Sequence, residues 1–244
     1  MSTWLALGAG VLALELAGAL AGAETLPTKA GDVTFTPVNH ATLVIAWAGK
    51  TVYVDPVGNA KWYESFAKPD AVLVTHIHGD HYQEGVLREV VAAGTRLIVP
   101  PALAEALPKE LKDRATPLAN GKDTALFGAM LTAVPMYNLT AARLKFHPKG
   151  QGNGYVLELG GKRIYLSGDT EDTPEMRALK SIDVAFLCMN LPYTMSVEQA
   201  ADAVRAFKPK VVYPYHSRGS DTARFQKLVG EDVGVEVRLR NWYP

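Results

Sequence analysis

Three of the six histidines of the chain occur within six residues, in the run Thr75-His76-Ile77-His78-Gly79-Asp80-His81. The run directly follows Val72–Val74, an apolar segment that is typical of a buried strand. Polar side chains that leave the end of such a strand project into the mouth of a sheet, where ligands commonly bind. Imidazole and carboxylate groups at this density suit Zn²⁺ and also accept Fe or Mn. The spacing therefore predicts a metal centre rather than a solvated, histidine-rich turn.

The composition of the chain limits the classes of protein to which it can belong. Its 244 residues are 48% hydrophobic and 20% charged, which is ordinary for a globular protein and excludes wholesale disorder. The 25 basic and 25 acidic residues balance, which argues against nucleic acid or an anionic surface as the main partner. The single cysteine, Cys188, excludes a disulfide framework and a Cys-rich zinc site, and its apolar surroundings predict a buried, inert thiol.

The first 23 residues differ from the rest of the chain. Trp4 to Leu20 is rich in Leu, Ala and Gly, and Ala21-Gly22-Ala23 has the small-x-small pattern of a cleavage site. We therefore predict a signal peptide over residues 1–23 and a periplasmic or secreted domain over residues 24–244. The missing basic residues and the acidic Glu15 leave open a retained membrane anchor or an unprocessed helix. A membrane would then be contacted only through an uncleaved N-terminal segment.

The remainder of the chain repeats one plan. A hairpin over residues 42–54, turning at Gly49-Lys50, resembles a later hairpin over residues 155–166 that turns at Gly160-Gly161. Each is followed by a strand, a helix and a strand: residues 70–74, 85–93 and 96–100, and then residues 183–187, a helix from Ser196, and residues 210–214. Ser196 and Gln199 form a capping-box pattern. Two such halves bury their sheets best face to face, which predicts a single α/β domain with a four-layer αββα sandwich.

With the His76–His81 run matching H-x-H-x-D-H, the sequence resembles the metallo-β-lactamase fold superfamily from about Asp32 to Trp242. The resemblance includes Gly168-Asp169 after the second hairpin and His216 after a late strand. It is greatest to the branch of stand-alone metal-dependent hydrolases that are similar to ascorbate-lactone hydrolases and N-acyl phospholipid hydrolases. Asn39-His40 fits the early histidine of that branch.

The resemblance implies a site for two metal ions, expected to be zinc. It assigns His76 and His78 to the first ion, Asp80, His81 and His216 to the second ion, and Asp169 to a bridge between them. A carboxylate bridge is reasonable because its negative charge lowers the repulsion between two cations that lie about 3.5–4 Å apart.

The sequence departs from the family at one ligand. The family usually places a further ligand of the first ion just after the strand that ends here at Val134-Pro135, where this chain has Asn138, a poor zinc ligand. We expect His147, nine residues later, to take that role, the alternative being a loop histidine that contacts substrate or solvent. Asn138, His40 and Tyr193 are expected to contact substrate, and Lys149 and Arg218 are candidates for binding a substrate anion.

These observations predict an exported, dinuclear zinc hydrolase whose substrate is a small-molecule ester, lactone, amide or phosphodiester. The ions would lower the pKa of a shared water and supply hydroxide near neutral pH, while Asp80 would help to orient the nucleophile and move its proton. Two alternatives remain: an iron-dependent oxidoreductase on the same scaffold, and a non-catalytic protein that binds a metal or another ligand. Neither the fold nor the ligands select the substrate, and the sequence leaves the oligomeric state open.

Overall fold

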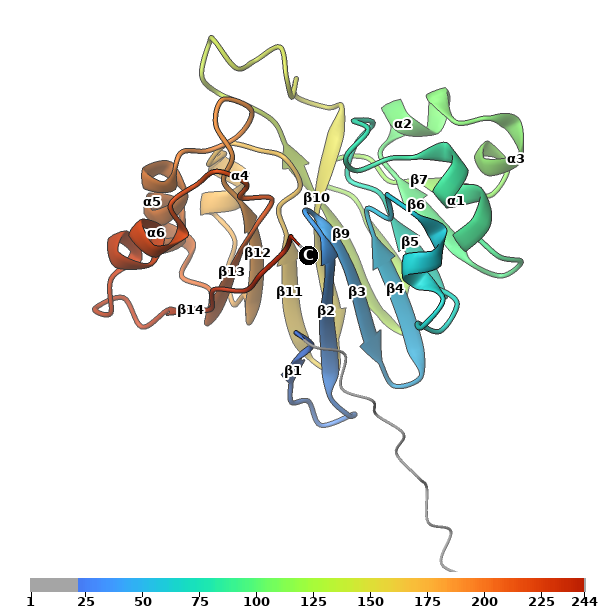
Figure 1. Cartoon of the computed structure of the whole chain (residues 1–244), viewed down its shortest axis with the longest axis horizontal. Coiled ribbons are helices and arrows are strands. Elements are labelled where there is room, and N and C mark those ends of the chain that lie inside the picture. The colour runs from blue at the N-terminus through green and yellow to red at the C-terminus, as the bar shows by residue number, and fades with distance from the viewer. Residues whose placement is uncertain (1–21, 244) are drawn as a thin grey trace, which may run out of the picture.

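A computed structural model describes residues 22–243 of the chain (Figure 1). The expected signal peptide, residues 1–23, falls almost wholly outside the described residues. Within residues 22–243, none of the helices combines the length and the apolar character that crossing a bilayer requires.

Two seven-stranded sheets form the centre of the molecule. The first sheet contains, in spatial order, β1 (Glu24–Leu26), β2 (Val33–Asn39), β3 (Thr42–Trp47), β4 (Lys50–Val54), β5 (Ala71–Leu73), β6 (Arg96–Val99) and β7 (Ala115–Pro117). The second contains β8 (Asp123–Leu126), β9 (Ala129–Met136), β10 (Gly152–Leu159), β11 (Lys162–Leu166), β12 (Val184–Cys188), β13 (Val211–Tyr215) and β14 (Glu236–Val237). In each sheet the first four strands are antiparallel and the last three continue in parallel.

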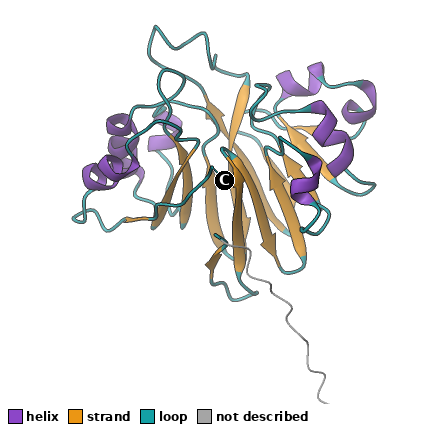
Figure 2. Ribbon diagram, viewed as in Figure 1, coloured by secondary structure: helices purple, strands orange, loops and turns teal. Residues whose placement is uncertain are grey.

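The helices lie on the two outer sides of the sheets, as Figure 2 shows. The first side carries η1 (Ala60–Tyr63), α1 (Glu84–Val90), α2 (Pro101–Ala106) and α3 (Lys109–Lys112). The second side carries α4 (Pro174–Arg177), α5 (Val197–Phe207) and α6 (Thr222–Val229). The α/β class, the four layers and the two similar halves are thus confirmed, and both halves of the expected capping box form at the start of α5. Helix α1 ends earlier than expected because Val91 takes an extended ψ of 96°.

The apolar strands bury both of their faces. Leu43 and Ile45 of β3 contribute to the core between the two sheets, together with Leu157 of β10. Val44, between them in sequence, faces the other way and belongs to the core that includes Leu87 of α1. Successive side chains of a strand alternate between its faces, so a strand that is covered on both sides must be apolar throughout. This packing fixes the register of each strand, and therefore where each one ends.

Candidate metal centre

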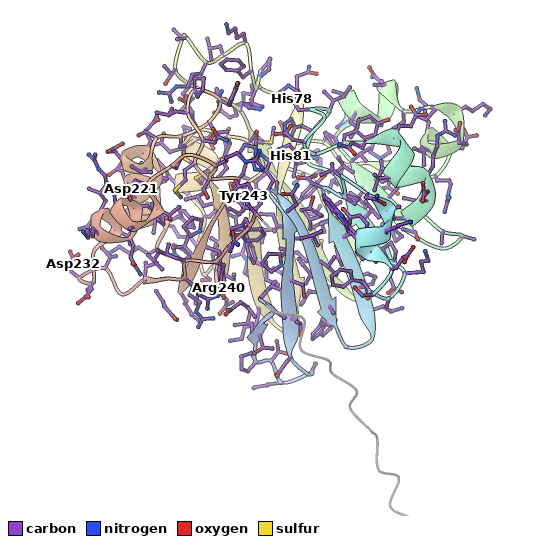
Figure 3. All side chains as sticks on the ribbon, in the orientation of Figure 1. His78, His81, Asp221, Asp232, Arg240 and Tyr243 are labelled. Atoms are coloured by element: carbon purple, nitrogen blue, oxygen red, sulfur yellow. The ribbon has the colours of Figure 1, made fainter. Side chains whose placement is uncertain are left out.

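The candidate site lies where the parallel strands of both sheets end. His76–His81 follow β5, Asp169 follows β11 and His216 follows β13. The carboxyl ends of parallel strands meet at one edge of a sheet, and the face-to-face packing brings the two edges together. Figure 3 shows His78 and His81 at this upper edge, between the two sets of helices.

A first group of potential ligands consists of His76, His78 and His147, whose nearest donor atoms all lie within 4.8 Å of one another. Nε2 of His76 lies 3.0 Å from Nδ1 of His78. His147 comes from the long connection between β9 and β10, and its Nε2 lies 3.4 Å from Oδ2 of Asp169. The structure therefore brings His147, rather than Asn138, to the place expected for the third donor of the first ion.

A second group surrounds Asp80. Oδ2 of Asp80 lies 3.4 Å from Nε2 of His216 and 3.8 Å from Nε2 of His81. Asp169 lies between the two groups, because Nε2 of His216 is 3.2 Å from its Oδ2 and Nε2 of His81 is 3.3 Å from its Oδ1. One carboxylate thus contacts histidines from both groups, which is the placement expected for a bridging ligand.

The donor atoms fit cations. Within residues 22–243, Nε2 of His81, Nε2 of His147 and Oδ1 of Asp169 are buried without a hydrogen-bond partner. Leaving such a group unpaired costs about 1–3 kcal/mol, so short N···O separations around Asp169 without hydrogen bonds fit side chains that are arranged to bind cations. Burial and the nearby His81 ring hold the pKa of His76 well below its ordinary value, which leaves a neutral ring. Neutral imidazoles are the form that binds a metal ion.

The carboxylates of the site are in the charged form that metal binding needs. Burial by itself raises the pKa of Asp169, but the nearby His216 and His81 rings lower it by more than burial raises it. The net pKa of Asp169 therefore lies well below the usual range. His81 behaves in the opposite way: burial lowers its pKa, while Asp169 and Asp55 raise it well above its ordinary value. A cation that binds at His81 must therefore displace a proton from it.

Asp55 orients His81 and was not singled out in the sequence. Its fully buried carboxylate accepts hydrogen bonds from Nδ1 of His81 at 2.7 Å, and from the Thr75 backbone N–H at 2.7 Å and hydroxyl at 2.8 Å. With Nδ1 protonated, Nε2 of His81 is free to face the centre, an arrangement that is common for metal-binding histidines. The available signal was position, because Asp55 directly follows β4, whose parallel neighbour β5 precedes His76.

Asn138 differs from its expected role in substrate contact. It is buried and lines neither cavity of the site, because its side chain lies behind the His147 ring. The amide nitrogen donates to the Tyr193 carbonyl oxygen at 2.7 Å and lies 3.3 Å from Nδ1 of His147. Nδ1 of His147 is itself 3.2 Å from the Tyr193 carbonyl oxygen, so its N–H points there and Nε2 points to the centre. Asn138 and His147 thus donate to the same carbonyl oxygen, and Asn138 packs beside His147 outside both cavities.

Two cavities meet at Asp80. The first, of about 430 Å³, is lined by His78, Asp80, Phe146, His147, Asp169, Asn190, Tyr193 and His216. The second, of about 380 Å³, is lined by Asn39, His40, Val57, Gly58, Gly79, Asp80, Gln83 and Arg218. Tyr193, which is 47% exposed, and Phe146 form an aromatic wall, with ring centroids 5.1 Å apart. The structure therefore places Tyr193 and His40 beside the centre, as expected.

The two cations expected near the site differ in their surroundings. Lys149 pairs with Glu175 at 2.9 Å and contributes to neither cavity. Arg218 lines the second cavity and lies 4.7 Å above the Tyr243 ring, and it forms no ion pair within residues 22–243.

Cys188 is fully buried, and burial raises the pKa of its thiol to about 12, which agrees with an inert role.

Two face-to-face mixed sheets with a histidine- and aspartate-rich edge define the metallo-β-lactamase fold. The family model described as "Beta-lactamase superfamily domain" matches residues 34–216, and the chain belongs to this family. A metal-dependent hydrolase of Pyrococcus abyssi is 30% identical over 215 residues, which cover 82% of this chain and 93% of that protein. With the ligand groups described above, these likenesses identify the chain as a metal-dependent hydrolase of the metallo-β-lactamase superfamily.

Solved structures agree with this assignment. A protein from Parabacteroides distasonis, assigned as a metal-dependent hydrolase, superposes with a TM-score of 0.82 at 36% identity, covering 91% of this chain and 99% of that one. A metallo hydrolase from Ignicoccus hospitalis superposes with a TM-score of 0.72 at 22% identity, covering 87% of this chain and 96% of that one. The second likeness bears on the fold alone.

Proposed function

We propose that the protein is an exported, dinuclear zinc hydrolase that cleaves an ester, lactone, amide or phosphodiester bond in a small molecule. The observation that carries the proposal is the placement of Asp169, whose carboxylate contacts His81, His147 and His216 between the two ligand groups. His76, His78 and His147 would hold one ion, and Asp80, His81 and His216 would hold the other. Nitrogen-rich donors with carboxylates suit zinc, and they also accept iron or manganese.

The protein's own groups divide the remaining work. When bound, the ions supply Lewis acidity toward a water molecule and a substrate oxygen. The Asp80 side chain is 49% exposed, whereas those of Asp169 and His216 are at most 4% exposed. Asp80 is therefore the carboxylate that can reach the attacking water, orient it and help to move its proton toward solvent or the leaving group. Phe146 and Tyr193 offer an aromatic surface for an apolar part of the substrate.

The proposal is tested first by the metal content of the purified protein and then by turnover. We expect two zinc ions per chain, and loss of bound metal in His78→Ala and in His216→Ala. A panel of chromogenic esters, lactones, phosphodiesters and β-lactams should contain a substrate whose hydrolysis stops on chelation and returns with zinc. Full occupancy without turnover would favour a binding protein, and iron with oxygen consumption would favour an oxidoreductase. Protein that binds none of these metals would refute the proposal.

Export has a separate support and a separate test. Strand β1 begins at Glu24. The Glu24 carboxylate accepts a hydrogen bond from the Tyr213 hydroxyl at 3.1 Å and forms ion pairs with Arg238 and Arg240. Cleavage after Ala23 would leave these contacts intact. N-terminal sequencing of the protein recovered from the periplasm or medium should begin at Glu24. Recovery of the full-length chain from the cytoplasm alone would contradict export without affecting the hydrolase proposal.

A further inference from the structure

The last residues that the structure describes pack against the candidate site. Trp242 is buried, its ring lies 5.7 Å from that of Tyr215, and its carbonyl oxygen accepts a hydrogen bond from the His40 N–H at 2.9 Å. Tyr243 follows it directly, and Figure 3 shows this residue just below His81. The contacts of Trp242 therefore hold the neighbouring Tyr243 side chain beside the candidate metal centre.

The Tyr243 hydroxyl joins two parts of the site. Its oxygen accepts a hydrogen bond from the Ser217 backbone N–H at 2.9 Å, immediately after His216. The same oxygen lies 2.9 Å from Nδ1 of His40. A hydroxyl has one hydrogen to donate, and a lone pair on Nδ1 can receive it.

The other side of the His40 ring decides where its hydrogen lies. Nε2 of His40 is 3.3 Å from Oδ2 of Asp80, and an ionised carboxylate can only accept. Nε2 must therefore carry a hydrogen, whether the ring is neutral or charged. In the neutral ring this leaves the lone pair on Nδ1, where the Tyr243 hydroxyl donates. The order is Ser217 N–H to Tyr243, Tyr243 to His40, and His40 to Asp80, with every group in an allowed role.

An alternative use of His40, as a metal ligand, would compete with its hydrogen bond to Asp80. His40, Asp80 and His216 are close enough together to form a third potential metal group. Coordination by Nε2 of His40 would require a lone pair on that atom and would break its bond to Asp80. The His40 and His216 rings also lie against each other, with centroids 3.8 Å apart, which limits turning of the His40 ring.

We propose that Tyr243 is a positioning residue that acts through His40 to fix the carboxylate of Asp80, and that His40 donates a hydrogen bond rather than binding metal. Asp80 needs such support because its side chain is 49% exposed and is not confined by packing. The inference rests on the proposed function only in taking Asp80 as a metal ligand.

The first test compares Tyr243→Phe with Tyr213→Phe. Tyr213 is the matched control, because its hydroxyl also has two partners, Glu24 and Arg238, and lies outside both cavities. Zinc affinities are measured by chelator competition, with His216→Ala identifying the ion that Asp80 holds. We expect Tyr243→Phe to lower the affinity for that ion about 10-fold, as loss of a ligand-orienting group does. The affinity for the other ion should stay unchanged. Equal affinities in the two variants would overturn the proposal.

The second test uses the conservative variant of His40. His40 has a positive φ of 56°, and Gln and Leu are both unbranched at Cβ, so backbone strain is comparable in the two variants. Gln can place an N–H near the position of Nε2, and Leu cannot. We expect His40→Gln to retain most of the affinity of the Asp80-held ion, His40→Leu to lose it about as Tyr243→Phe does, and neither to lower the affinity of the other ion. Equal loss in His40→Gln and His40→Leu would show that a donated N–H at this position does not account for the role of His40, and would overturn the proposal.

A third readout is independent of zinc. Nitrogen-15 NMR of the histidine rings distinguishes the two tautomers, and the His40→Gln spectrum assigns the His40 signals. We expect the Nε2–H form of His40 in the wild type and a mixture of forms in Tyr243→Phe. If the wild type binds no zinc, the proposed function fails while this readout still decides the role of Tyr243. The Nδ1–H form of His40 in the wild type would overturn the proposal.

Discussion

Replacement of Asp55 by asparagine tests whether the second ligand group depends on a charge that touches no metal. The Asp55 carboxylate lies opposite three donors: the Thr75 backbone N–H, the Thr75 hydroxyl and Nδ1 of His81. Asparagine keeps the shape of the side chain but removes its charge and exchanges one acceptor for an NH₂ group. Because Asp55 is fully buried, bulk water cannot reach the site to take over the lost role.

Either orientation of the new amide disturbs His81. If the NH₂ group faces Nδ1, that atom must become the acceptor and the ring hydrogen moves to Nε2, which then cannot bind a metal ion. If the amide oxygen faces Nδ1, the NH₂ group faces the Thr75 backbone N–H and two donors oppose each other. A hydrogen bond to a charged group contributes about 1.5–3 kcal/mol, which corresponds to roughly 10- to 100-fold in affinity. We expect Asp55→Asn to lower the affinity for the ion that His81 holds by this factor.

The assay is stepwise zinc binding by chelator competition, accompanied by urea unfolding of the metal-free protein. Asp183→Asn is the matched control, because Asp183 is buried and accepts from the Arg163 backbone N–H at 2.9 Å and from Lys210 at 2.8 Å, outside both cavities. It should lose stability without losing zinc affinity. Folded Asp55→Asn that binds both ions as tightly as the wild type would refute the reasoning.

Three further outcomes follow from the structure. His147→Ala should lose the ion of the first group, and elemental analysis showing unchanged metal content would remove His147 from the ligands. Arg218→Gln should raise KM for substrates that carry a carboxylate and leave KM for matched neutral substrates unchanged in steady-state kinetics; equal effects on both would contradict an anion-binding role. Burial raises the pKa of Glu171, but hydrogen bonds from Thr140 and Leu139 outweigh it and the net pKa is lowered. A lowered folded-state pKa stabilises the protein above the unfolded pKa and loses this effect as pH falls through the folded value. The stability gap between the wild type and Glu171→Gln, about 1.5–3 kcal/mol at pH 7, should therefore shrink in urea unfolding at pH 3, and a gap that is independent of pH would contradict it.

The central strands were predictable because their signals are local. Turn residues such as Gly49 and Gly161 lie between apolar runs long enough to show a strand pattern, and Ser196 marks the start of α5. The edge strands were not predicted. β14 has two residues and β1 has three, too few to show a period of two, and each exists because a neighbouring strand offers unpaired backbone groups. Their formation is a consequence of the assembled sheet rather than of their own residues.

The candidate ligands were predictable for a similar reason, whereas the residues that orient them were not. His76, Asp169 and His216 each follow a recognisable strand, so their place at the sheet edge could be inferred from order alone. Asp55 is 26 residues from His81, and Tyr243 is 203 residues from His40. A hydrogen bond over such a separation leaves no periodic mark in a single sequence. Likewise, nothing in the sequence indicated that Asn138 packs beside His147 instead of contacting substrate, because that contact depends on the path of the loop between the two residues.

That loop explains how a ligand can lie far from the strand that usually supplies it. Holding a loop residue in one conformation costs about 1–2 kcal/mol of backbone entropy, so a ligand at the far end of a loop needs anchors that act before the metal binds. The backbone N–H of Asn138 donates to the His147 carbonyl oxygen at 2.9 Å and closes the loop at its base. The fully buried side chain of Glu171 accepts from the Thr140 N–H at 2.5 Å and from its hydroxyl at 2.7 Å, and pairs with Arg143. The Asn138 side chain adds two further anchors, because its amide nitrogen donates to the carbonyl oxygens of Arg143 at 3.0 Å and Tyr193 at 2.7 Å. Asparagine is therefore suited to position 138 because its side chain holds the loop in place, and this lets His147 serve as the donor.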